Sequence, residues 1–347
     1  MARTLTSPLL DALPFDDVID VRSPSEFAED HIPGALNLPV LDDAERAKVG
    51  TIYTRQDRFL ARRIGAALVA RNAARHLEEA LADRGGGWRP LVYCWRGGQR
   101  SGAFATILGQ VGWRAETIEG GYRAYRRLVK RALYDAPFAN RLILIDGGTG
   151  TGKTQLLDHL GTLGAQVVDL EGLAAHRGSN FGALEVPQPS QKMFESRLLP
   201  ELARLDPDRP VFMEAESNAI GDILIPPALW KAMGTAEVVR LEAPLPARAR
   251  FLTTTYPDLT ADPHLLASRI DALRPYQPRE RIEDWHALAA EERFAALAEG
   301  LIAHHYDPRY GRTTREGRRV IGEVTLTDLS EGDRARAAAE VLAIAGG

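Results

Sequence analysis

The sequence predicts an α/β protein of two domains, each built around a parallel β-sheet, with a helical part at the C-terminal end. Three observations favour this class. The chain has 347 residues, more than one hydrophobic core usually supports. Short apolar runs typical of buried strands alternate with segments of helical spacing in both halves. Two of these strands run directly into glycine-rich loops, and the pattern restarts between them.

The composition is that of a soluble globular protein, with 45% apolar and 26% charged residues. The net charge is −4, so contact with a polyanion would need a local basic patch. No apolar run reaches the roughly 18 residues of a membrane span, and the N-terminus lacks a signal-peptide pattern. A single cysteine excludes an internal disulfide and a Cys-based zinc site. We therefore expect a cytoplasmic protein that contacts no membrane and has no dedicated metal site.

The first domain is expected to span residues 1–135. The apolar run "VIDV" is typical of a buried strand, and the Ser23-Pro24 pair is a typical helix start. A long Arg-rich segment of helical spacing precedes a second buried run, "LVYCW". The predicted order is strand 16–23, a short helix, helix 55–83, strand 89–95, helix 100–113 and, within 114–133, a strand and a basic helix.

The second domain is expected to span residues 136–347, because the pattern restarts around "YDAPFANR". Four further apolar runs are typical of strands, and helical stretches separate them, so a second parallel sheet is predicted. Beyond about residue 258 the pattern predicts helices only. The predicted strands are 141–148, 164–172, 209–217 and 235–244.

Cys94 ends a predicted strand and directly precedes a loop rich in glycine and arginine. Backbone amides in such a loop can turn toward one centre, and the next helix N-terminus adds positive potential. These effects lower the pKa of a thiol from about 8.5 and hold an oxyanion in front of the sulfur. We predict a catalytic thiolate, with a buried structural cysteine as the alternative. The predicted oxyanion loop comprises Trp95, Arg96, Gly97, Gly98, Gln99, Arg100 and Ser101.

The second glycine-rich loop, "GGTGTGKT", fits G-x-x-x-x-G-K-[ST] and lies between an apolar strand and a helix. Its amides would cradle a diphosphate, while Lys153 reaches the outer phosphate and Thr154 faces Mg²⁺. A chance glycine-rich turn is the alternative. The motif predicts diphosphate binding and does not by itself predict NTP hydrolysis. The predicted contacts come from Gly147, Gly148, Thr149, Gly150, Thr151, Gly152, Lys153 and Thr154.

Acidic side chains follow the neighbouring strands and are candidates for Mg²⁺ binding or acid–base catalysis. Glu214 ends its strand in the usual place of the second acid of a P-loop site, where Asp is more frequent. Glu216 lies two residues further on. Asp169 and Glu171 end another strand at what should be the same sheet edge. For each of them a solvated loop residue is an equal alternative.

The segments around Cys94 resemble the rhodanese superfamily. The upstream stretch "DVRSPSEFAEDHIPGALNLP" is similar to its motif, with matches at Asp20, Arg22, Glu26, Phe27, His31, Gly34, Ala35 and Asn37. The resemblance implies that Asp20 and Arg22 organise the loop and that His31 is structural. The loop from Cys94 to Arg100 is one residue longer than the common sulfurtransferase loop and is similar to that of rhodanese-like phosphatases.

A rhodanese-like parallel-sheet domain followed by a P-loop NTPase-like α/β domain with a helical C-terminal part resembles the tRNA 2-selenouridine synthase family. The loops "CWRGGQRS" and "GGTGTGKT" are similar to those of that family. So are "DLEGLAAHRGSNFG", "QPSQKMFESRL", "MEAESNAIG" and "YDPRYG". Asn218 departs from the family pattern, in which Arg is more frequent.

This resemblance implies a tRNA substrate with a 5-substituted 2-thiouridine at the wobble position. It implies that geranyl diphosphate first alkylates the 2-thio group, and that selenium from selenophosphate then displaces the geranylthiol. The P-loop, with Lys153 and Mg²⁺, suits the first step, and the enlarged loop after Cys94 suits selenophosphate. Selenophosphate synthetase is a candidate partner.

A basic helix with Tyr122 and Tyr125 interleaved is the candidate tRNA surface, with a solvated helix face as the alternative. Its basic residues are Arg123, Arg126, Arg127, Lys130 and Arg131. A second basic cluster covers residues 309–319. The polar loop after Glu171 is a candidate substrate loop, in which His176, Arg177 and Ser179 would lie near phosphates.

Two other functions stay open at this point. One is a rhodanese-like sulfurtransferase or Cys-dependent phosphatase fused to a P-loop kinase-like domain. The other is a non-catalytic P-loop sensor that uses the rhodanese-like module for protein contacts. The presence of both Cys94 and Lys153 argues against the sensor, and no kinase acceptor site is recognisable along the chain.

Overall fold

The computed structural model describes residues 2–9, 13–179, 181–182, 186–309 and 318–346. Its packing divides the chain into two compact units. The first consists of Met1–Ala136 and Pro189–Arg204, and the second of Pro137–Gln188 and Leu205–Gly347. The predicted α/β class with parallel sheets is confirmed for both. No helix within these described ranges has the length and apolar character that a bilayer crossing requires.

The first unit is built on a parallel sheet whose strand order is β1-β5-β4-β2-β3. Its strands are β1 (Ala2–Arg3), β2 (Asp17–Asp20), β3 (Leu36–Asn37), β4 (Pro90–Tyr93) and β5 (Glu116–Ile118). Its helices are α1 (Pro24–Glu29), α2 (Asp43–Arg55), α3 (Arg58–Glu78), α4 (Gln99–Val111), α5 (Gly121–Lys130), the π-helical η2 (Arg131–Asp135) and α8 (Gln191–Ala203). The long helical segment predicted at 55–83 is thus the second helix of an α2–α3 pair.

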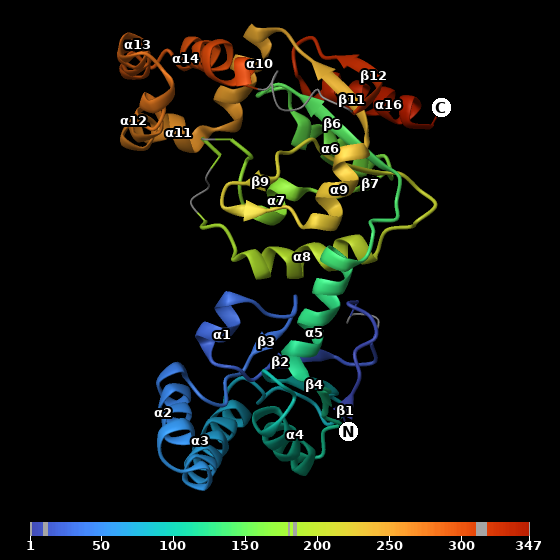
Figure 1. Ribbon diagram of the computed structural model, residues 1–347, viewed down its shortest axis with the longest axis vertical. Helices are drawn as coiled ribbons and strands as arrows, with labels where there is room; N and C mark the ends of the chain where they lie inside the picture. Colours follow the sequence, from blue (N-terminus) through green and yellow to red (C-terminus); the bar gives the residue numbers. More distant parts are fainter. Residues whose placement is uncertain (1, 10–12, 180, 183–185, 310–317, 347) are drawn as a thin grey trace. The chain divides into compact units, whose positions relative to one another are not determined.

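The two faces of this first sheet differ in character. Ile19 pairs in register with Val92, and both belong to an apolar core with residues of α3 and α4. Asp20 and Tyr93 are the next pair and point to the opposite face, because side chains alternate along a strand. Helices α1 and α5 lie on that second face (Figure 1). The second face therefore carries buried polar groups such as Asp20 beside apolar side chains such as Leu91, and the cysteine loop leaves β4 directly after Tyr93.

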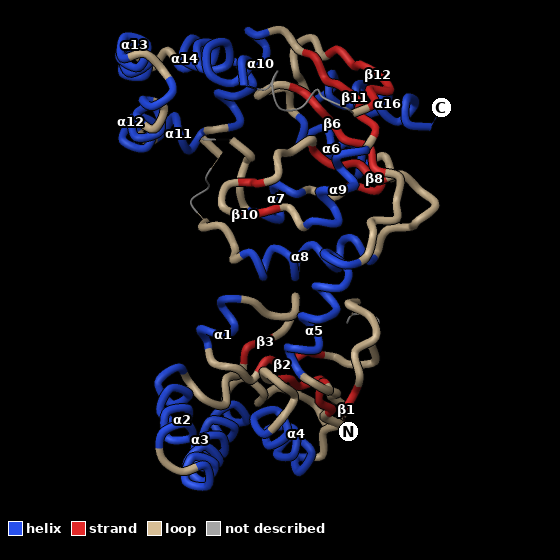
Figure 2. Tube along the Cα trace, in the orientation of Figure 1, coloured by secondary structure: helices blue, strands red, loops and turns tan. Residues whose placement is uncertain are grey.

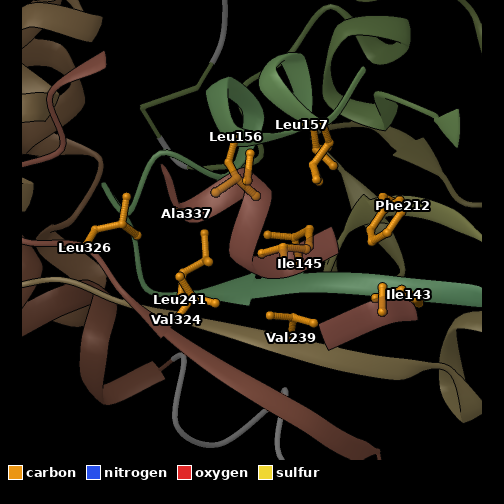
Figure 3. Close-up of a cluster of buried hydrophobic side chains, with 14 of the residues drawn as sticks. Ile143, Ile145, Leu156, Leu157, Phe212, Val239, Leu241, Val324, Leu326 and Ala337 are labelled. Atoms are coloured by element: carbon orange, nitrogen blue, oxygen red, sulfur yellow. The ribbon is translucent and has the colours of Figure 1, made fainter. Parts of the chain in front are cut away.

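The second unit contains a parallel sheet with the order β12-β11-β6-β8-β7. Its strands are β6 (Leu142–Gly147), β7 (Gln166–Val167), β8 (Val211–Glu214), β11 (Glu237–Glu242) and β12 (Arg319–Thr325). A short antiparallel pair, β9 (Ala219–Ile220) and β10 (Ile223–Leu224), follows β8. Helices α6 (Lys153–Thr162) and α16 (Glu331–Gly346) pack together on one face of the sheet. Figure 3 shows Leu156 of α6 and Ala337 of α16 over Ile145, Leu241 and Val324.

The remaining helices of the second unit lie between β7 and β12 in the chain, and Figure 2 shows most of the chain after β11 as helix. They are α7 (Leu170–Ala174), α9 (Pro227–Thr235), α10 (Leu245–Thr255), α11 (Pro257–Ala261), α12 (Pro263–Asp271), the 3₁₀ turn η3 (Arg274–Tyr276), α13 (Arg279–Ala290), α14 (Phe294–Leu301) and the π-helical η4 (Ile302–Tyr306).

The prediction of helices only beyond residue 258 is wrong at β12, which pairs in parallel with β11. Only Val324 of this edge strand is fully buried, so its sequence lacks the continuous apolar run of an interior strand. Pairing with β11 decides its conformation, and a local pattern carries no information about that pairing.

Candidate active site

The loop after Cys94 is fixed by close backbone packing. At Gly97, which has a φ of +64°, an added Cβ would lie 2.3 Å from the Ile118 carbonyl oxygen. At Gly121 it would lie 2.2 Å from the carbonyl oxygen of Cys94. The amide of Tyr122 donates to that same carbonyl at 2.9 Å. Only glycine fits at these two positions, so the start of α5 packs closely against the loop and the end of β4.

The Cys94 thiol is 4% exposed and accepts a hydrogen bond from the Ser101 hydroxyl at 3.2 Å. Burial alone would raise the pKa of this thiol. Hydrogen bonds from the Ser101 hydroxyl and from the amides of Ser101 and Gly98, together with the charge of Arg100, outweigh burial and lower the pKa below its ordinary value. The cysteine is therefore buried, yet its surroundings favour the thiolate form more than those of an inert core cysteine do.

The two arginines of the loop differ in their contacts. Arg100 donates to Glu26 at 2.8 Å, and Arg46 reaches the same carboxylate at 2.8 Å. Arg96 is exposed and forms no ion pair within the described part of the chain. Trp95, 36% exposed, lies against the Tyr122 ring with centroids 5.2 Å apart. Arg96 is thus the cation of this loop that can turn to an incoming anion.

The upstream motif supports the loop from the sheet face that carries Asp20 and Tyr93. Arg22 is 1% exposed and donates through Nε and Nη2 to the Asp20 carboxylate, at distances of 2.6 to 3.0 Å. Its guanidinium also lies 4.0 Å from the centre of the Tyr122 ring. His31 forms a hydrogen bond with the carbonyl oxygen of Phe27 at 2.9 Å and stacks on its ring. These residues act on the framework and do not touch the thiol.

The candidate tRNA-binding residues on and next to α5 differ in their exposure to solvent. The two tyrosines of the helix are buried, Tyr122 at 3% and Tyr125 at 0% exposed, so neither offers a ring to a splayed base. Arg126 is paired with Glu195 of α8 and lies 3.6 Å from Asp30. The exposed basic candidates are Arg123, Arg127 and Lys130 of α5 and Arg131, the first residue of η2. The second basic cluster predicted at 309–319 lies mostly outside the described residues, which resume at Arg318.

The P-loop connects β6 to α6 in the second unit. Gly150 and Gly152 have φ values of +82° and +73°, a left-handed conformation that favours glycine. The Lys153 ammonium donates to the Gly147 carbonyl at 3.0 Å, so it curls back over the loop. A Cβ at Gly148 would lie 2.6 Å from a guanidinium nitrogen of Arg248. The loop has the backbone conformation and the lysine that a diphosphate site needs.

Arg248 braces the P-loop and was not predicted from the sequence. It belongs to α10, is 8% exposed and donates through Nε to the Thr149 carbonyl at 2.9 Å. Its two terminal nitrogens bind both oxygens of Asp307, at 3.0 and 2.7 Å. Asp307 lies in the "YDPRYG" segment, which supplied the only sequence signal for this contact. The planar bidentate pair positions the loop backbone.

Four carboxylates gather beside the P-loop, and the structure places them at different depths. Glu171 accepts a hydrogen bond from the Thr154 hydroxyl at 3.1 Å and lines the cavity together with Asp169 and Glu216. Glu214 lies beneath, fully buried, and neither of its oxygens has a partner among the described residues. Asp169 caps α7 by accepting from the amide of Gly172 at 2.7 Å.

Every one of these carboxyl groups has a raised pKa. Burial raises the pKa of Glu214 well above its usual value, and the other acids add to the effect. Burial, and then the charge of Glu171, raise the pKa of Glu216 to about 8, although Lys153 opposes them. Burial also raises the pKa values of Glu171 and Asp169. Lys153 lowers the pKa values of Glu171 and Glu216 but does not offset their burial. The cluster therefore favours the binding of protons or of a cation.

These groups surround a cavity of about 720 Å³. Residues of the P-loop, the acids and the predicted substrate loop line it, among them Lys153, Glu216, His176 and Ser179. Arg177 also lines it, but this side chain pairs with Asp258 at 3.1 Å and lies over the Tyr256 ring. Burial, followed by the charge of Arg269, lowers the pKa of His176. Arg309 and Arg318, from the predicted basic cluster at 309–319, also line the cavity, as do Trp230, Phe251 and Tyr256, which the sequence did not single out.

Two family models match the chain and define its class. A rhodanese-like domain covers residues 5–128, and a tRNA 2-selenouridine synthase AAA domain covers residues 140–268. The protein thus joins a rhodanese-like domain to a P-loop domain.

Relatives named tRNA 2-selenouridine synthase extend the match beyond single domains. That of Bdellovibrio bacteriovorus is 35% identical over 300 residues, which are 82% of this chain and 74% of the relative. That of Nitrosomonas europaea is 36% identical over 67% of this chain, and that of Salmonella arizonae 38% over 69%. The chain belongs to the tRNA 2-selenouridine synthase family. It spans 61% of the Nitrosomonas europaea protein and 66% of the Salmonella arizonae protein.

Proposed function

We propose that this chain replaces the sulfur of a 5-substituted 2-thiouridine in tRNA by selenium. The observation that carries the proposal is that one chain of this family holds both a cysteine loop with a lowered thiol pKa and a P-loop beside a large cavity. The first is suited to a tetrahedral selenium donor and the second to an activated diphosphate ester. The reaction then has two steps, one assigned to each loop.

In the first step, the 2-thio sulfur attacks C1 of geranyl diphosphate. A sulfur–carbon bond forms, the carbon–oxygen bond to the diphosphate breaks, and N3 of the base loses its proton. The P-loop amides and Lys153 would take up the charge of the departing diphosphate. Arg248 supports this role because it fixes the loop backbone through the Thr149 carbonyl.

Mg²⁺ fits this end of the cavity. Thr154, Glu171 and Glu216 would hold it together with diphosphate oxygens, since Mg²⁺ usually takes one or two carboxylates and completes its shell with phosphate and water. Within the described residues no three His, Cys, Asp or Glu side chains form a metal cage of their own. The raised pKa values of Glu171 and Glu216 favour this assignment, because a bound cation would relieve their repulsion. When bound, the ion would neutralise charge on the leaving diphosphate.

In the second step, selenium from selenophosphate bonds to C2 of the base and geranylthiolate leaves. The phosphoryl group passes from selenium to water as phosphate. Amides of the Cys94 loop and the exposed Arg96 would hold the tetrahedral donor. Cys94 would lie beside the donor and assist the departure of geranylthiolate without itself forming a bond, a role that its lowered thiol pKa supports.

The tRNA would be held by exposed basic side chains, namely Arg123, Arg127 and Lys130 of α5 and Arg131 at the start of η2. We place the reaction in the cytoplasm, where a lone thiol stays reduced, with selenophosphate synthetase as the supplier of the donor.

The test is mass spectrometry of nucleosides from 2-thiouridine-bearing tRNA incubated with the purified protein. One reaction contains geranyl diphosphate and Mg²⁺, and the other contains selenophosphate as well. We expect a geranyl mass gain in the first and a sulfur-for-selenium gain in the second. No change in either, with phosphate release from a generic aryl phosphate, would instead identify a Cys-dependent phosphatase.

A further inference from the structure

A second, smaller cavity of about 80 Å³ adjoins the P-loop cavity in the second unit. The two share five lining residues: Thr149, Ser179, Leu252, Tyr256 and Tyr306. Thr149 is itself part of the P-loop. A ligand with its diphosphate on the P-loop could therefore extend directly into the smaller cavity.

The far wall of this smaller cavity is apolar. It is formed by side chains from α11, α12 and α14 and from the segment before α8, namely Phe181, Leu259, Leu266, Phe294, Leu297 and Leu301. Hydroxyls such as those of Ser179 and Tyr306 form the border with the larger cavity. The lining also contains Thr253 and Thr260, whose hydroxyls donate to the carbonyls of Arg250 and Pro257. An apolar void of this kind binds hydrocarbon in preference to water.

Its size and lining select among molecules that carry a diphosphate. At about 10–15 Å³ for each water-sized probe, 80 Å³ holds about five to eight heavy atoms. One isoprene unit has about five carbon atoms and needs no hydrogen bond, whereas a nucleobase is larger and would leave its ring nitrogens unpaired against leucine and phenylalanine. The lining thus fits a branched hydrocarbon better than a nucleotide.

We propose that this pocket binds the distal isoprene unit of a prenyl diphosphate and so selects the prenyl chain that the protein uses. The inference rests on the proposed function, in which a prenyl diphosphate occupies the P-loop. The proximal unit would lie in the larger cavity, and the pocket would hold the end of the chain.

The test compares two alanines of α14. Ala298 lines the pocket, whereas Ala295 is exposed on the same helix. Ala298→Leu places three more carbon atoms at the pocket wall, and Ala295→Leu makes the same change outside it. Binding of geranyl diphosphate and of inorganic diphosphate is measured by calorimetry for the wild type and both variants. Binding of inorganic diphosphate also reports that the P-loop of each variant is folded.

We expect the wild type and Ala295→Leu to bind geranyl diphosphate at least about tenfold more tightly than inorganic diphosphate, given the apolar area of one isoprene unit. Ala298→Leu should lose most of that difference and bind inorganic diphosphate as before. Should Ala298→Leu fail to fold, Phe294→Ala tests the same pocket by enlarging it. Its preference should shift from geranyl diphosphate toward farnesyl diphosphate, which is one isoprene unit longer.

The pocket assignment is overturned if geranyl and inorganic diphosphate bind the wild type equally, or if Ala298→Leu keeps the wild-type difference. It is overturned equally if Phe294→Ala leaves the chain-length preference unchanged. Failure of the proposed function is a separate result: the wild type would bind geranyl diphosphate through the pocket yet transfer no geranyl group to 2-thiouridine in tRNA.

Discussion

The cysteine loop and the P-loop both follow a buried parallel strand and precede a helix, yet their charge balance is opposite. Around Cys94 the hydrogen-bond donors and Arg100 outweigh burial and lower the thiol pKa. Around Lys153 the acids outnumber the lysine, and burial raises their pKa values. The surroundings of Cys94 thus favour negative charge on the thiol itself. The surroundings of Lys153 favour the binding of a cation together with a diphosphate.

This contrast has a structural basis in how each loop is supported. Backbone groups support the cysteine loop, because Gly97 and Gly121 allow the main chain to pack against itself. A long-range ion pair supports the P-loop, because Arg248 reaches the Thr149 carbonyl and is itself held by Asp307. Single side-chain changes should therefore separate the two sites cleanly.

The largest effect is expected from Cys94→Ala. Selenium incorporation should fall by at least about 1000-fold, because the substitution removes the only thiol of the chain. Geranylation of the 2-thio group should stay near the wild-type rate, since the P-loop is untouched. Both are read by nucleoside mass spectrometry. Selenium incorporation that survives in Cys94→Ala would remove the thiol from the reaction.

The converse variant is Lys153→Ala, for which we expect geranylation to fall by about 100-fold or more. The reason is loss of the cation that neutralises the leaving diphosphate. tRNA that has been geranylated beforehand should still be converted to the selenium product, and this substrate serves as the internal control. Unchanged geranylation in Lys153→Ala would show that the P-loop does not carry the first step.

A smaller effect is expected from Asp307→Asn, which weakens the brace without touching the ligand. The KM for geranyl diphosphate should rise by about tenfold, while kcat changes less, because Arg248 would hold the P-loop backbone less firmly. Arg240→Gln, which removes an exposed ion pair with Glu323, is the matched control and should behave as wild type. An equal loss in both variants would indicate general destabilisation instead.

The sequence was informative where the chemistry is local. Both loops are contiguous strand–glycine–helix segments, so their motifs carry most of their own geometry. The Arg248–Asp307 brace joins residues 59 positions apart, and nothing local indicates it. On α5 the position of Tyr122 and Tyr125 between basic residues suggested stacking, but together with Val129 they have the i, i+3, i+7 spacing of a core-facing stripe, and all three are buried. Strand β12 was missed because an edge strand lacks a continuous apolar run.

The smallest expected effect concerns Glu216 and the pH dependence of stability. Its pKa is raised to about 8 in the folded chain, above the ordinary value of 4.5. The folded state therefore holds a proton that the unfolded chain releases near pH 4.5, and stability is lost as the pH rises from about 4.5 toward 8. Glu216→Gln removes this dependence, because an amide does not titrate.

We therefore expect the Tm of Glu216→Gln, relative to that of the wild type, to increase by several degrees between pH 5 and pH 9, as followed by calorimetry. Mg²⁺ with inorganic diphosphate should diminish the increase, because a bound cation favours the ionised carboxylate and stabilises the wild type at high pH. That result would agree with a P-loop site whose acids lack sufficient positive charge until a cation binds. A Tm difference that is constant with pH would show that Glu216 is ionised throughout, and that the P-loop site is not short of positive charge.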